Sequence, residues 1–489
     1  MKLHDILQGT TPIARTTESN PEIDALSFDS RTVRPGTLFF ALSGSAVDGH
    51  SYIESAIERG ASAIVCERMP EPTPDIPCIA VNDTHEALGT AAANFYGHPS
   101  RQLRLVGVTG TNGKTTIATL LYDLFRRLGY RAGLISTVVY HIDERTVPST
   151  HTTPDAIRLQ AMMREMVDAG CDYCFMEVSS HSIVQRRIEG LHFAGAIFTN
   201  LTHDHLDYHK TFAEYLRAKK RLFDGLSAEA FALTNADDRN GCVMTQNCAA
   251  QTQSYSLRSM ADFRGRIIET HPDGMLLSID GKELWVHFLG RFNASNLLAV
   301  YGAARLLGAD RDEVLQAMSM LVPVNGRFET LRSADGVTAI VDYAHTPDAL
   351  QNVIATINEI RRPGQHLTVV VGCGGDRDRT KRPEMARIAV TDTDLAILTS
   401  DNPRTESPEA ILAEMRSGLT PADRAITVTD RREAIRQAVM GAAPSDIILV
   451  AGKGHETHQD VGGVKSHFDD KEEVRAAFDL FHPHTVTKS

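Results

Sequence analysis

Three observations predict an α/β protein of three domains. The chain has 489 residues, and at roughly 100–200 residues per domain this length corresponds to about two to four domains. Short apolar runs alternate with helical stretches, a pattern typical of sheets covered by helices. Two breaks in this pattern, near 98–102 and 325–336, contain proline, glycine and polar residues. We therefore expect an N-terminal domain at 1–100, a central domain at 101–331 and a C-terminal domain at 332–489.

Composition excludes several classes of protein. Hydrophobic residues make up 42% of the chain and charged residues 23%, which argues against disorder or a fibrous repeat. The formal net charge of −12 disfavours nucleic acid as the main partner. The 7 cysteines are too few for a disulfide scaffold, the stretch MKLHDILQGT lacks the apolar core expected of a secretion signal, and no run of about 18 apolar residues occurs. We expect a cytoplasmic monomer that is not inserted in a membrane.

The N-terminal segment has the pattern of a small α/β unit. Apolar runs at 37–42, 63–66 and 78–81 are each long enough for one short strand, and 51–59 is a helical stretch between two of them. The polar, proline-containing stretch HPSRQ (98–102) is the expected linker to the next domain.

The central segment opens with a phosphate-binding loop. An apolar strand, LRLVGVTG, runs into this loop, and a helix is expected over 115–128. The loop residues are Gly110, Thr111, Asn112, Gly113, Lys114, Thr115 and Thr116. Its N–H groups and the helix N-terminus would bind phosphate, Lys114 would neutralise phosphate charge, and the Thr115 hydroxyl would bind Mg²⁺. Val108 stands where the usual pattern has glycine, so the loop departs from the standard spacing.

Two further strands bring candidate metal ligands to the same domain. The strand within CFMEVSSH ends at Glu177, a position suited to a carboxylate that holds Mg²⁺. The stretch NLTHDHLDYH (200–209) follows the next strand and has three histidines and two aspartates, the composition of a metal site. Cys171 and Cys174 have no second pair at zinc spacing, so we interpret them as core residues.

The C-terminal segment predicts a parallel sheet. Apolar runs at 367–372, 394–400 and 446–452 alternate with helical stretches that are expected at 383–390, 408–419 and 431–440. This alternation is the signature of βαβ units.

The order of these motifs resembles the Mur ligases, which form amide bonds at the expense of ATP in peptidoglycan precursor synthesis. The resemblance rests on GTNGKTT, MEVSSH, NLTHDHLDYH, GRFNASN, NGRFE and DYAHTPDAL, and it covers nearly the whole chain. That family has the same shortened phosphate loop. FDSRTVRPGTLFFAL, HTTP, GGDRDRTKRP, DNPR and GKGHE resemble in particular the members that form the UDP-N-acetylmuramoyl tripeptide. The fold implied is a central phosphate-loop ATPase-like parallel sheet with a Rossmann-like C-terminal domain and a small α/β N-terminal domain.

The resemblance also implies a reaction. ATP phosphorylates a carboxylate of UDP-N-acetylmuramoyl-L-alanyl-D-glutamate, and the amine of meso-2,6-diaminopimelate attacks the acyl phosphate. By resemblance one Mg²⁺ uses Thr115 and Glu177, and a second uses His205 together with a carbamylated lysine (N6-carboxylysine), expected at Lys219. Lys220 is the alternative for the carbamylated position. Lys114, Lys219 and His205 are thus the expected catalytic residues.

The remaining site residues follow from the same resemblance. ATP contacts beyond the loop are expected at Asn293, Asn296, Arg327 and Asp342. Contacts to the UDP-muramoyl dipeptide are expected at Phe28, Ser30, Ser45, Ala46, Val47, Thr152, Thr153, Ser179, Gln185 and Arg187. Contacts to diaminopimelate are expected at Arg377, Asp401, Asn402, Pro403, Arg404, Gly452 and Glu456. Two arginine forks and a glutamate suit a ligand with a second amino-acid head, because they pair with its carboxylate and ammonium groups.

Three alternatives remain open at this level. A lysine-adding member of the family would usually lack an arginine at the position of Arg404. A folylpolyglutamate-type ligase shares the phosphate loop, but we would not expect it to have FDSR or DNPR. A phosphate-loop ATPase coupled to motion or partner binding would be expected to end its strand in aspartate, where this chain has Glu177.

Overall fold

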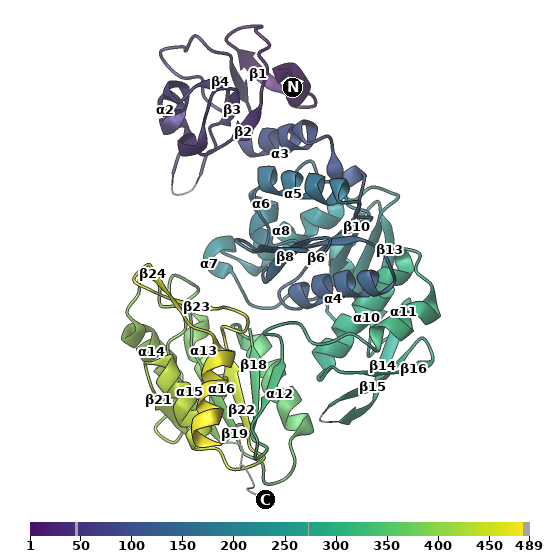
Figure 1. Ribbon diagram of the computed structural model, residues 1–489, viewed down its shortest axis with the longest axis vertical. Helices are drawn as coiled ribbons and strands as arrows, with labels where there is room; N and C mark the ends of the chain where they lie inside the picture. Colours follow the sequence, from purple (N-terminus) through teal and green to yellow (C-terminus); the bar gives the residue numbers. More distant parts are fainter. Residues whose placement is uncertain (45–46, 272, 483–489) are drawn as a thin grey trace, which may run out of the picture.

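A computed structural model describes residues 1–44, 47–271 and 273–482. Figure 1 shows three α/β bodies along the long axis of the molecule, with the N-terminal one at the top and the C-terminal one at the bottom. The predicted α/β class is confirmed by the mixed, largely parallel sheets of each body.

The N-terminal domain is a five-stranded sheet in the order β1-β5-β4-β3-β2 among its described residues. Only β1 runs antiparallel to its neighbour. The strands are β1 (Pro12–Arg15), β2 (Ala25–Ser27), β3 (Thr37–Phe40), β4 (Ala61–Cys66) and β5 (Cys78–Val81), and the helices are α1 (Leu3–Ile6), α2 (Ile53–Glu58) and α3 (Thr84–Phe95). All four residues of β3 and of β5 are buried, which explains their continuous apolar runs.

The expected linker at 98–102 is not an open connection. It contains the 3₁₀ turn η3 (Pro99–Arg101), in which Ser100 is fully buried and its hydroxyl accepts a hydrogen bond from the His192 N–H at 3.0 Å. A Cβ atom on Gly89 of α3 would lie only 2.4 Å from the Cβ of Glu189. The N-terminal domain is therefore packed closely on the central domain, a contact that the local sequence pattern did not indicate.

The central domain contains an eleven-stranded sheet among its described residues, in the order β16-β15-β14-β13-β12-β11-β6-β10-β7-β8-β9. Strands β14 to β7 in this order are parallel, and antiparallel hairpins extend both edges. Its strands are β6 (Arg104–Thr109), β7 (Ala132–Ile135), β8 (Val139–Ile142), β9 (Arg145–Pro148), β10 (Tyr173–Glu177), β11 (Gly195–Phe198), β12 (Phe231–Asn235), β13 (Gln251–Ser256), β14 (Phe263–His271), β15 (Gly274–Ile279) and β16 (Lys282–Val286). Its helices are α4 (Lys114–Arg127), α5 (Ala156–Asp168), α6 (Ser180–Val184), α7 (Leu206–His209), α8 (Phe212–Asp224), α9 (Gly241–Met244), α10 (Arg291–Leu306) and α11 (Arg311–Met318).

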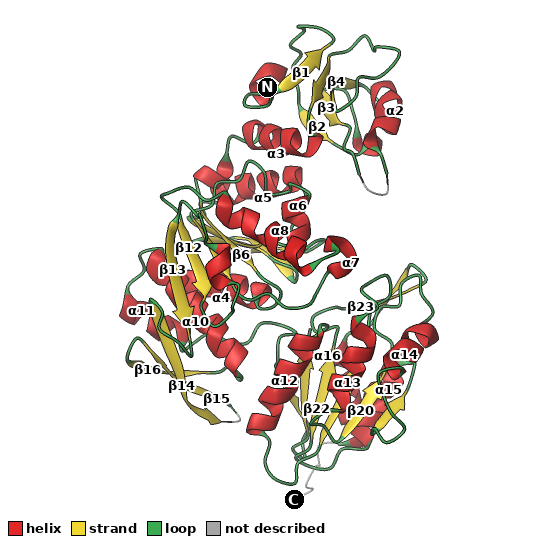
Figure 2. Ribbon diagram, turned by 180° about the vertical axis from the view of Figure 1, so that it is seen from behind, coloured by secondary structure: helices red, strands yellow, loops and turns green. Residues whose placement is uncertain are grey.

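Helices cover both faces of the parallel strands, as Figure 2 shows for the whole molecule. Val106 and Phe175 pack into the apolar cluster that includes α4 and α10, whereas Leu105 and Met176 pack on the opposite side with α5 and α8. Because both faces are buried, β6 and β10 are apolar along nearly their whole length. Cys171 and Cys174 are buried, as expected of core residues.

The C-terminal domain has a six-stranded sheet among its described residues, in the order β17-β18-β22-β19-β20-β21. Its strands are β17 (Glu329–Arg332), β18 (Thr338–Asp342), β19 (Leu367–Val371), β20 (Leu395–Leu398), β21 (Ala425–Thr427) and β22 (Ile447–Ala451), with the separate hairpin β23 (His458–Val461) and β24 (Val464–His467). Its helices are α12 (Pro347–Ile360), α13 (Lys381–Val390), α14 (Pro408–Arg416), α15 (Arg431–Met440) and α16 (Asp470–Phe481). Strand β17 pairs antiparallel with β18, so this sheet begins at Glu329 rather than at the boundary of 332 expected from the sequence.

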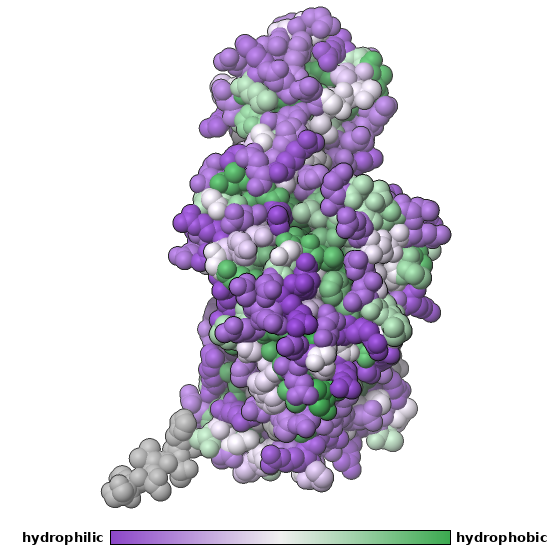
Figure 3. Space-filling view, turned by 90° about the vertical axis from the view of Figure 1, so that its right-hand side faces the viewer, coloured by the Kyte–Doolittle hydropathy of each residue, from purple (hydrophilic) through white to green (hydrophobic). Residues whose placement is uncertain are grey.

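The surface is mostly hydrophilic, as expected from the ordinary proportions of hydrophobic and charged residues in the chain. Hydrophilic residues cover most of the face shown in Figure 3, and apolar residues gather near its middle. Within the described ranges, none of the helices is both long and apolar enough to cross a membrane.

Candidate active site

A cavity of about 600 Å³ lies between the central and C-terminal domains, and both domains line it. The central domain contributes the phosphate loop to this lining, and the C-terminal domain contributes the loops that follow β19, β20 and β22. The predicted site residues that line it are Thr111, Asn112, Gly113, Lys114, Thr115, Thr116, Thr152, Glu177, Ser179, His205, Lys219, Asn293, Asn296, Arg327, Asp342, Arg377, Asp401, Asn402, Arg404, Gly452 and Glu456. Tertiary structure thus brings together residues from all four predicted groups, those for ATP, the metal ions, the UDP-muramoyl dipeptide and diaminopimelate.

The phosphate loop has the backbone that its glycines allow. Gly110 has a φ of +150°, and a Cβ atom there would lie 1.9 Å from Thr199 Oγ1. Gly113 has a φ of +87° and directly precedes α4, which begins at Lys114. Side chains other than hydrogen cannot occupy either position without displacing a neighbour. The loop therefore places its N–H groups at the start of a 14-residue helix, an arrangement that favours phosphate.

The Lys114 side chain folds back over its own loop. Its Nζ donates to the carbonyl oxygens of Gly110 at 2.9 Å and Thr111 at 2.7 Å. Burial lowers the pKa of Lys114, and the nearby Glu177 carboxylate acts in the opposite direction. The Thr115 hydroxyl accepts a hydrogen bond from Arg327 Nη2 at 2.9 Å, so the segment that leads from the central domain into β17 contacts the phosphate loop directly.

Glu177 is the last residue of β10 and is almost completely buried. Its Oε1 accepts the Thr137 N–H at 2.6 Å, and the Thr137 hydroxyl lies 2.9 Å from that of Thr152. Thr153 is buried next to this group and donates its hydroxyl to the Glu177 carbonyl at 2.8 Å. The carboxylate thus lies at the carboxyl end of the parallel strands, the edge at which open α/β sheets bind ligands.

Lys219 on α8 faces the phosphate loop, while Lys220 does not. Lys219 is 1% exposed, and its Nζ donates to the Gly110 carbonyl oxygen at 2.7 Å. Burial lowers the pKa of Lys219 well below its usual value, and the Lys114 charge lowers it further. Lys220 instead pairs with Asp224 on its own helix and donates to the Gln246 carbonyl oxygen at 2.7 Å. A buried lysine that loses its proton easily is the type that reacts to form a carbamate.

The histidine-rich stretch at 200–209 does not assemble into one metal site. His203 Nε2 lies 3.2 Å from Asp378 Oδ2, across the domain interface, and His209 Nε2 lies 2.8 Å from Ser180 Oγ. Burial lowers the pKa of His205 to about 3, so its ring is neutral and available as a ligand. Across residues 1–44, 47–271 and 273–482, no three His, Cys, Asp or Glu side chains gather closely enough to hold a metal by themselves.

Mg²⁺ nevertheless fits the residues present. This ion is usually held by one or two carboxylates plus substrate phosphates and water, so a full protein cage is not required. The Glu177 carboxylate and Thr115 hydroxyl line the same cavity as His205 and Lys219. The side-chain oxygen atoms of Glu177 and Thr115 are the hard ligands that Mg²⁺ prefers.

The proposed ATP contacts lie at the junction of two domains. Asn293 and Asn296 are buried in the first turns of α10, and a Cβ on Gly113 would lie 2.6 Å from Asn296 Oδ1. Asp342 ends β18 and accepts the Phe328 N–H at 2.6 Å; burial raises the pKa of its carboxyl to about 6. The Arg327 guanidinium lies 4.4 Å from the centre of the Tyr343 ring.

The loops that follow β20 and β22 form one polar network. Glu456 Oε2 accepts from Asn402 Nδ2 at 2.7 Å and from Lys453 Nζ at 3.1 Å. Lys453 is fully buried and also donates to the His458 carbonyl oxygen at 2.6 Å and to Asn402 Oδ1 at 3.2 Å. Gly452 has a φ of +116°, and a Cβ there would lie 2.6 Å from Asp401 Oδ2. The sequence interpretation missed Lys453, although its place within GKGHE, just after a buried strand, was a usable signal.

The residues expected to contact the UDP-muramoyl dipeptide divide between two places. Phe28, Gln185 and Arg187 line a second cavity of about 310 Å³ between the N-terminal and central domains. Thr152 and Ser179 line the main cavity instead. Ser30 is buried and Val47 is exposed, and neither residue lines either of these two cavities. Pro403, which was expected to contact diaminopimelate, does not line them either. Ser45 and Ala46 lie outside the described residues.

Arg187 joins the two groups of dipeptide contacts. Its Nε and Nη2 donate to Gln185 Oε1 at 2.9 and 2.6 Å, and its Nη1 donates to the Thr153 carbonyl oxygen at 2.8 Å. Thr153 in turn lies beside Glu177, so one guanidinium links the smaller cavity to the end of β10.

Comparison with known proteins relates most of the chain to one family. Three family descriptions match successive parts of the chain: "Mur ligase family, catalytic domain" at 22–96, "Mur ligase middle domain" at 108–304 and "Mur ligase, glutamate ligase domain" at 326–454. A curated protein of Phocaeicola vulgatus, named UDP-N-acetylmuramoyl-L-alanyl-D-glutamate--2,6-diaminopimelate ligase, is 56% identical over 481 residues, which span 98% of this chain and 99% of that protein.

Solved structures extend the comparison to the fold. A structure of a UDP-N-acetylmuramoyl-L-alanyl-D-glutamate--2,6-diaminopimelate ligase superposes with a TM-score of 0.69 at 32% identity, covering 99% of both chains. A folylpolyglutamate synthase of Mycobacterium tuberculosis, complexed with ADP and AMPPCP, superposes with a TM-score of 0.61 at 18% identity over 76% of this chain and 93% of that chain, a likeness in fold alone. Because the near relatives match over almost their whole length and all three parts of the family pattern are present, this chain belongs to the Mur ligase family.

Proposed function

We propose that this protein is an ATP-dependent ligase that joins meso-2,6-diaminopimelate to UDP-N-acetylmuramoyl-L-alanyl-D-glutamate through an acyl phosphate, in peptidoglycan precursor synthesis. The observation that carries the proposal is one cavity lined both by a phosphate loop and by two arginines with a glutamate, in a chain 56% identical to a relative of that name. ATP and Mg²⁺, with two ions expected, are the proposed cofactors.

The reaction must bring two anions together. The ATP γ-phosphate and the substrate carboxylate repel each other, and we assign Lys114 and the N–H groups at the start of α4 to hold the phosphates. Mg²⁺, when bound, would offset the remaining negative charge, and Thr115, Glu177, His205 and Lys219 are the residues that would hold it. Most of the rate should come from positioning and charge stabilisation, because phosphoryl transfer requires little covalent chemistry from the protein.

Carbamylation is the proposed role for Lys219. A neutral lysine amine adds carbon dioxide and releases one proton to become a carbamate, so a side chain that is ordinarily a cation becomes an anion able to bind a metal ion. Burial of Lys219 beside the Gly110 carbonyl supports this role, and the exposed pairing of Lys220 with Asp224 argues against the neighbour.

The cavity wall formed by the C-terminal domain suits an acceptor with two amino-acid heads. Arg377 and Arg404 would bind the carboxylate of the distal head, and Glu456 would accept hydrogen bonds from its ammonium group. Asn402 and Lys453 both bind Oε2 of Glu456, so this carboxylate is held in one orientation at the cavity wall.

We further propose that the enzyme acts as a cytoplasmic monomer on these small molecules. Analytical ultracentrifugation of the purified protein would test the monomeric state.

Product formation tests the proposal directly. The protein would be incubated with ATP, Mg²⁺, the UDP-muramoyl dipeptide and either diaminopimelate or lysine, while phosphate release and product mass are followed. We expect phosphate release that requires the dipeptide and is much faster with diaminopimelate. Equal or faster reaction with lysine would point to the lysine-adding alternative, and phosphate release without the dipeptide would contradict the ligase assignment.

A further inference from the structure

Two loops in the C-terminal domain each contribute one of the arginines proposed to bind diaminopimelate. Residues 374–378 follow β19 and include Arg377; residues 402–406 follow β20 and include Arg404. We call them the acceptor loops. The Gly375 N–H donates to the Asn402 carbonyl oxygen at 2.9 Å, and Arg404 Nη1 donates to the Gly375 carbonyl oxygen at 2.7 Å. The two loops therefore contact each other directly at the cavity wall.

A residue at the tip of each loop has an unfavourable backbone. Asp376 and Arg404 both have a φ of +53°, the left-handed region in which residues with a Cβ atom are strained. Such conformations persist only where surrounding contacts determine them. Here the Asp376 carboxylate accepts the Thr405 hydroxyl at 2.7 Å and the Thr405 N–H at 3.2 Å, so each loop holds the other in its strained form.

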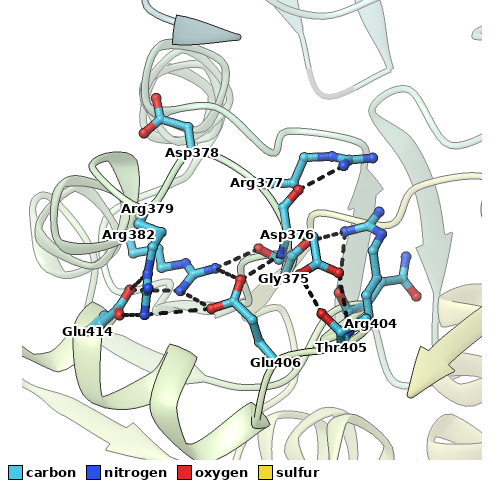
Figure 4. Close-up of polar contacts among 12 residues, drawn as sticks. Gly375, Asp376, Arg377, Asp378, Arg379, Arg382, Arg404, Thr405, Glu406 and Glu414 are labelled. Carbon is cyan, nitrogen blue, oxygen red and sulfur yellow. Dashed lines mark hydrogen bonds and ion pairs between the residues drawn. The ribbon is translucent and has the colours of Figure 1, made fainter. Parts of the chain in front are cut away.

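Behind the two loops lies an ion-pair cluster, shown in Figure 4. Arg382 at the start of α13 is fully buried and donates to Glu406 through Nη2 at 2.7 Å and Nη1 at 2.9 Å. The same guanidinium donates to the Gly374 carbonyl oxygen at 3.2 Å. Glu406 Oε1 also accepts the Asp376 N–H at 2.6 Å. The Glu406 carboxylate thus binds the backbone of the first loop, is itself part of the second loop, and pairs with Arg382 on α13 below both loops.

This carboxylate is ionised throughout the ordinary pH range. The hydrogen bonds from Arg382 lower the pKa of Glu406 to about 2, and the Asp376 N–H acts in the same direction. Charged partners make these contacts stronger than neutral ones of the same geometry. The cluster does not line the cavity, so its contribution to the reaction would be indirect.

We propose that Glu406, clamped by Arg382, is a positioning residue that sets the separation of Arg377 and Arg404 and thereby the preference for an acceptor with a second amino-acid head. The proposal rests on the proposed function, because it assumes that these two arginines bind the acceptor. A single-headed amine such as lysine would gain little from correct spacing of the pair, so loss of the clamp should lower discrimination and leave ATP binding intact.

Glu406→Gln tests this role, with Glu414→Gln as its matched control. Gln keeps the shape of Glu406 and an acceptor for the Asp376 N–H but removes the charge. Glu414 accepts from the same Arg382 Nη1 at 2.7 Å, but it lies on α14, and within the part of the chain that the structure describes none of its hydrogen bonds or ion pairs is with either acceptor loop. Initial rates of the full-length enzyme would be measured with diaminopimelate, lysine and ATP varied in turn.

We expect E406Q to raise the KM for diaminopimelate roughly tenfold, since a charged hydrogen bond becomes a neutral one, and to change the KM for ATP by less than about twofold. The ratio of kcat/KM for diaminopimelate to that for lysine should fall, while E414Q should leave it unchanged. Equal effects on diaminopimelate and ATP, or an E414Q enzyme that behaves like E406Q, would overturn the proposal.

A second variant keeps the proposal testable if E406Q does not fold. Thr405→Val removes the hydroxyl bond to Asp376 at the exposed side of the loops and should shift the same KM in the same direction, by a smaller factor. If E406Q unfolds, an unchanged diaminopimelate KM in T405V would overturn the proposal. If the wild-type enzyme uses a different amine, the proposed function is wrong, and the same comparison with that amine then decides the role of Glu406.

Discussion

Arg404→Ala is expected to weaken binding of the acceptor amino acid selectively. Arg404 lines the cavity, and its Nη1 is held by the Gly375 carbonyl oxygen, which leaves the rest of the guanidinium to pair with a carboxylate. A hydrogen-bonded charged contact contributes about 1.5–3 kcal/mol. At about 1.4 kcal/mol per tenfold, its loss should raise the KM for diaminopimelate roughly 10–150-fold, with little change in the KM for ATP.

The backbone at Arg404 provides an internal comparison. Because its φ is +53°, Ala in this position retains the left-handed strain, which glycine does not experience. Arg404→Gly should therefore lose as much affinity for the acceptor as Arg404→Ala while unfolding at the same or a higher temperature. Arg416→Ala is the control, since this exposed arginine on α14 binds only the Thr427 hydroxyl among its described side-chain contacts.

The assay is initial-rate kinetics with one substrate varied at a time, together with thermal unfolding of each variant. Equal increases in the KM for ATP and for diaminopimelate in Arg404→Ala would refute the reasoning, because they would mean that DNPR is only a structural turn. A Gly variant that retains wild-type affinity would refute it as well, since the side chain would then be dispensable.

Four further predictions concern the metal region and the core of the C-terminal domain. Lys219→Met should lower kcat at least about 100-fold, because it removes a buried group beside the phosphate loop. The kcat of the control variant Lys220→Met should stay within about twofold of the wild-type value. Native mass spectrometry should detect one added carboxyl group only when Lys219 is present. Lys453→Met leaves Glu456 without its buried cation and should destabilise the C-terminal domain by about 3 kcal/mol in urea unfolding; an unchanged midpoint would contradict the network described here. Arg431 and Asp470 form a fully buried pair 2.7 Å apart, so Arg431→Met should cost about 3–5 kcal/mol, and a double variant with Asp470→Leu should recover part of that loss in a double-mutant cycle. Removal of divalent ions with a chelator should stop product formation and added Mg²⁺ should restore it; persistent activity in the chelator would count against a metal-dependent step.

Local motifs predicted the elements of the fold well. The expected strand at 78–81 and the helix at 431–440 coincide with β5 and α15, and the expected helix at 115–128 differs from α4 by one residue at each end. These elements depend on neighbouring residues: buried apolar runs, glycine turns and helix starts. Several strands were not predicted, and one of them is β17, which is short and half exposed, so its pairing with β18 was not visible in the pattern.

The site was predictable where a single strand end or loop carries the chemistry. The phosphate loop and Glu177 lie where their strands end, because parallel strands bring their carboxyl ends to one edge. The histidine-rich stretch was not predictable in the same way. Its members point to partners as far away in sequence as Asp378, which lies 175 residues from His203.

The sequence by itself determined the fold class, the phosphate loop and the order of the functional motifs, because each depends on residues that are close along the chain. Only the tertiary structure decided that Lys219 rather than Lys220 faces the phosphate loop, that Lys453 is the buried partner of Glu456, and that Glu406 ties the two acceptor loops together. The physical reason is that a side chain's partners depend on how separate elements pack. The burial of these side chains, and with it their charge state, is set by residues from distant parts of the chain.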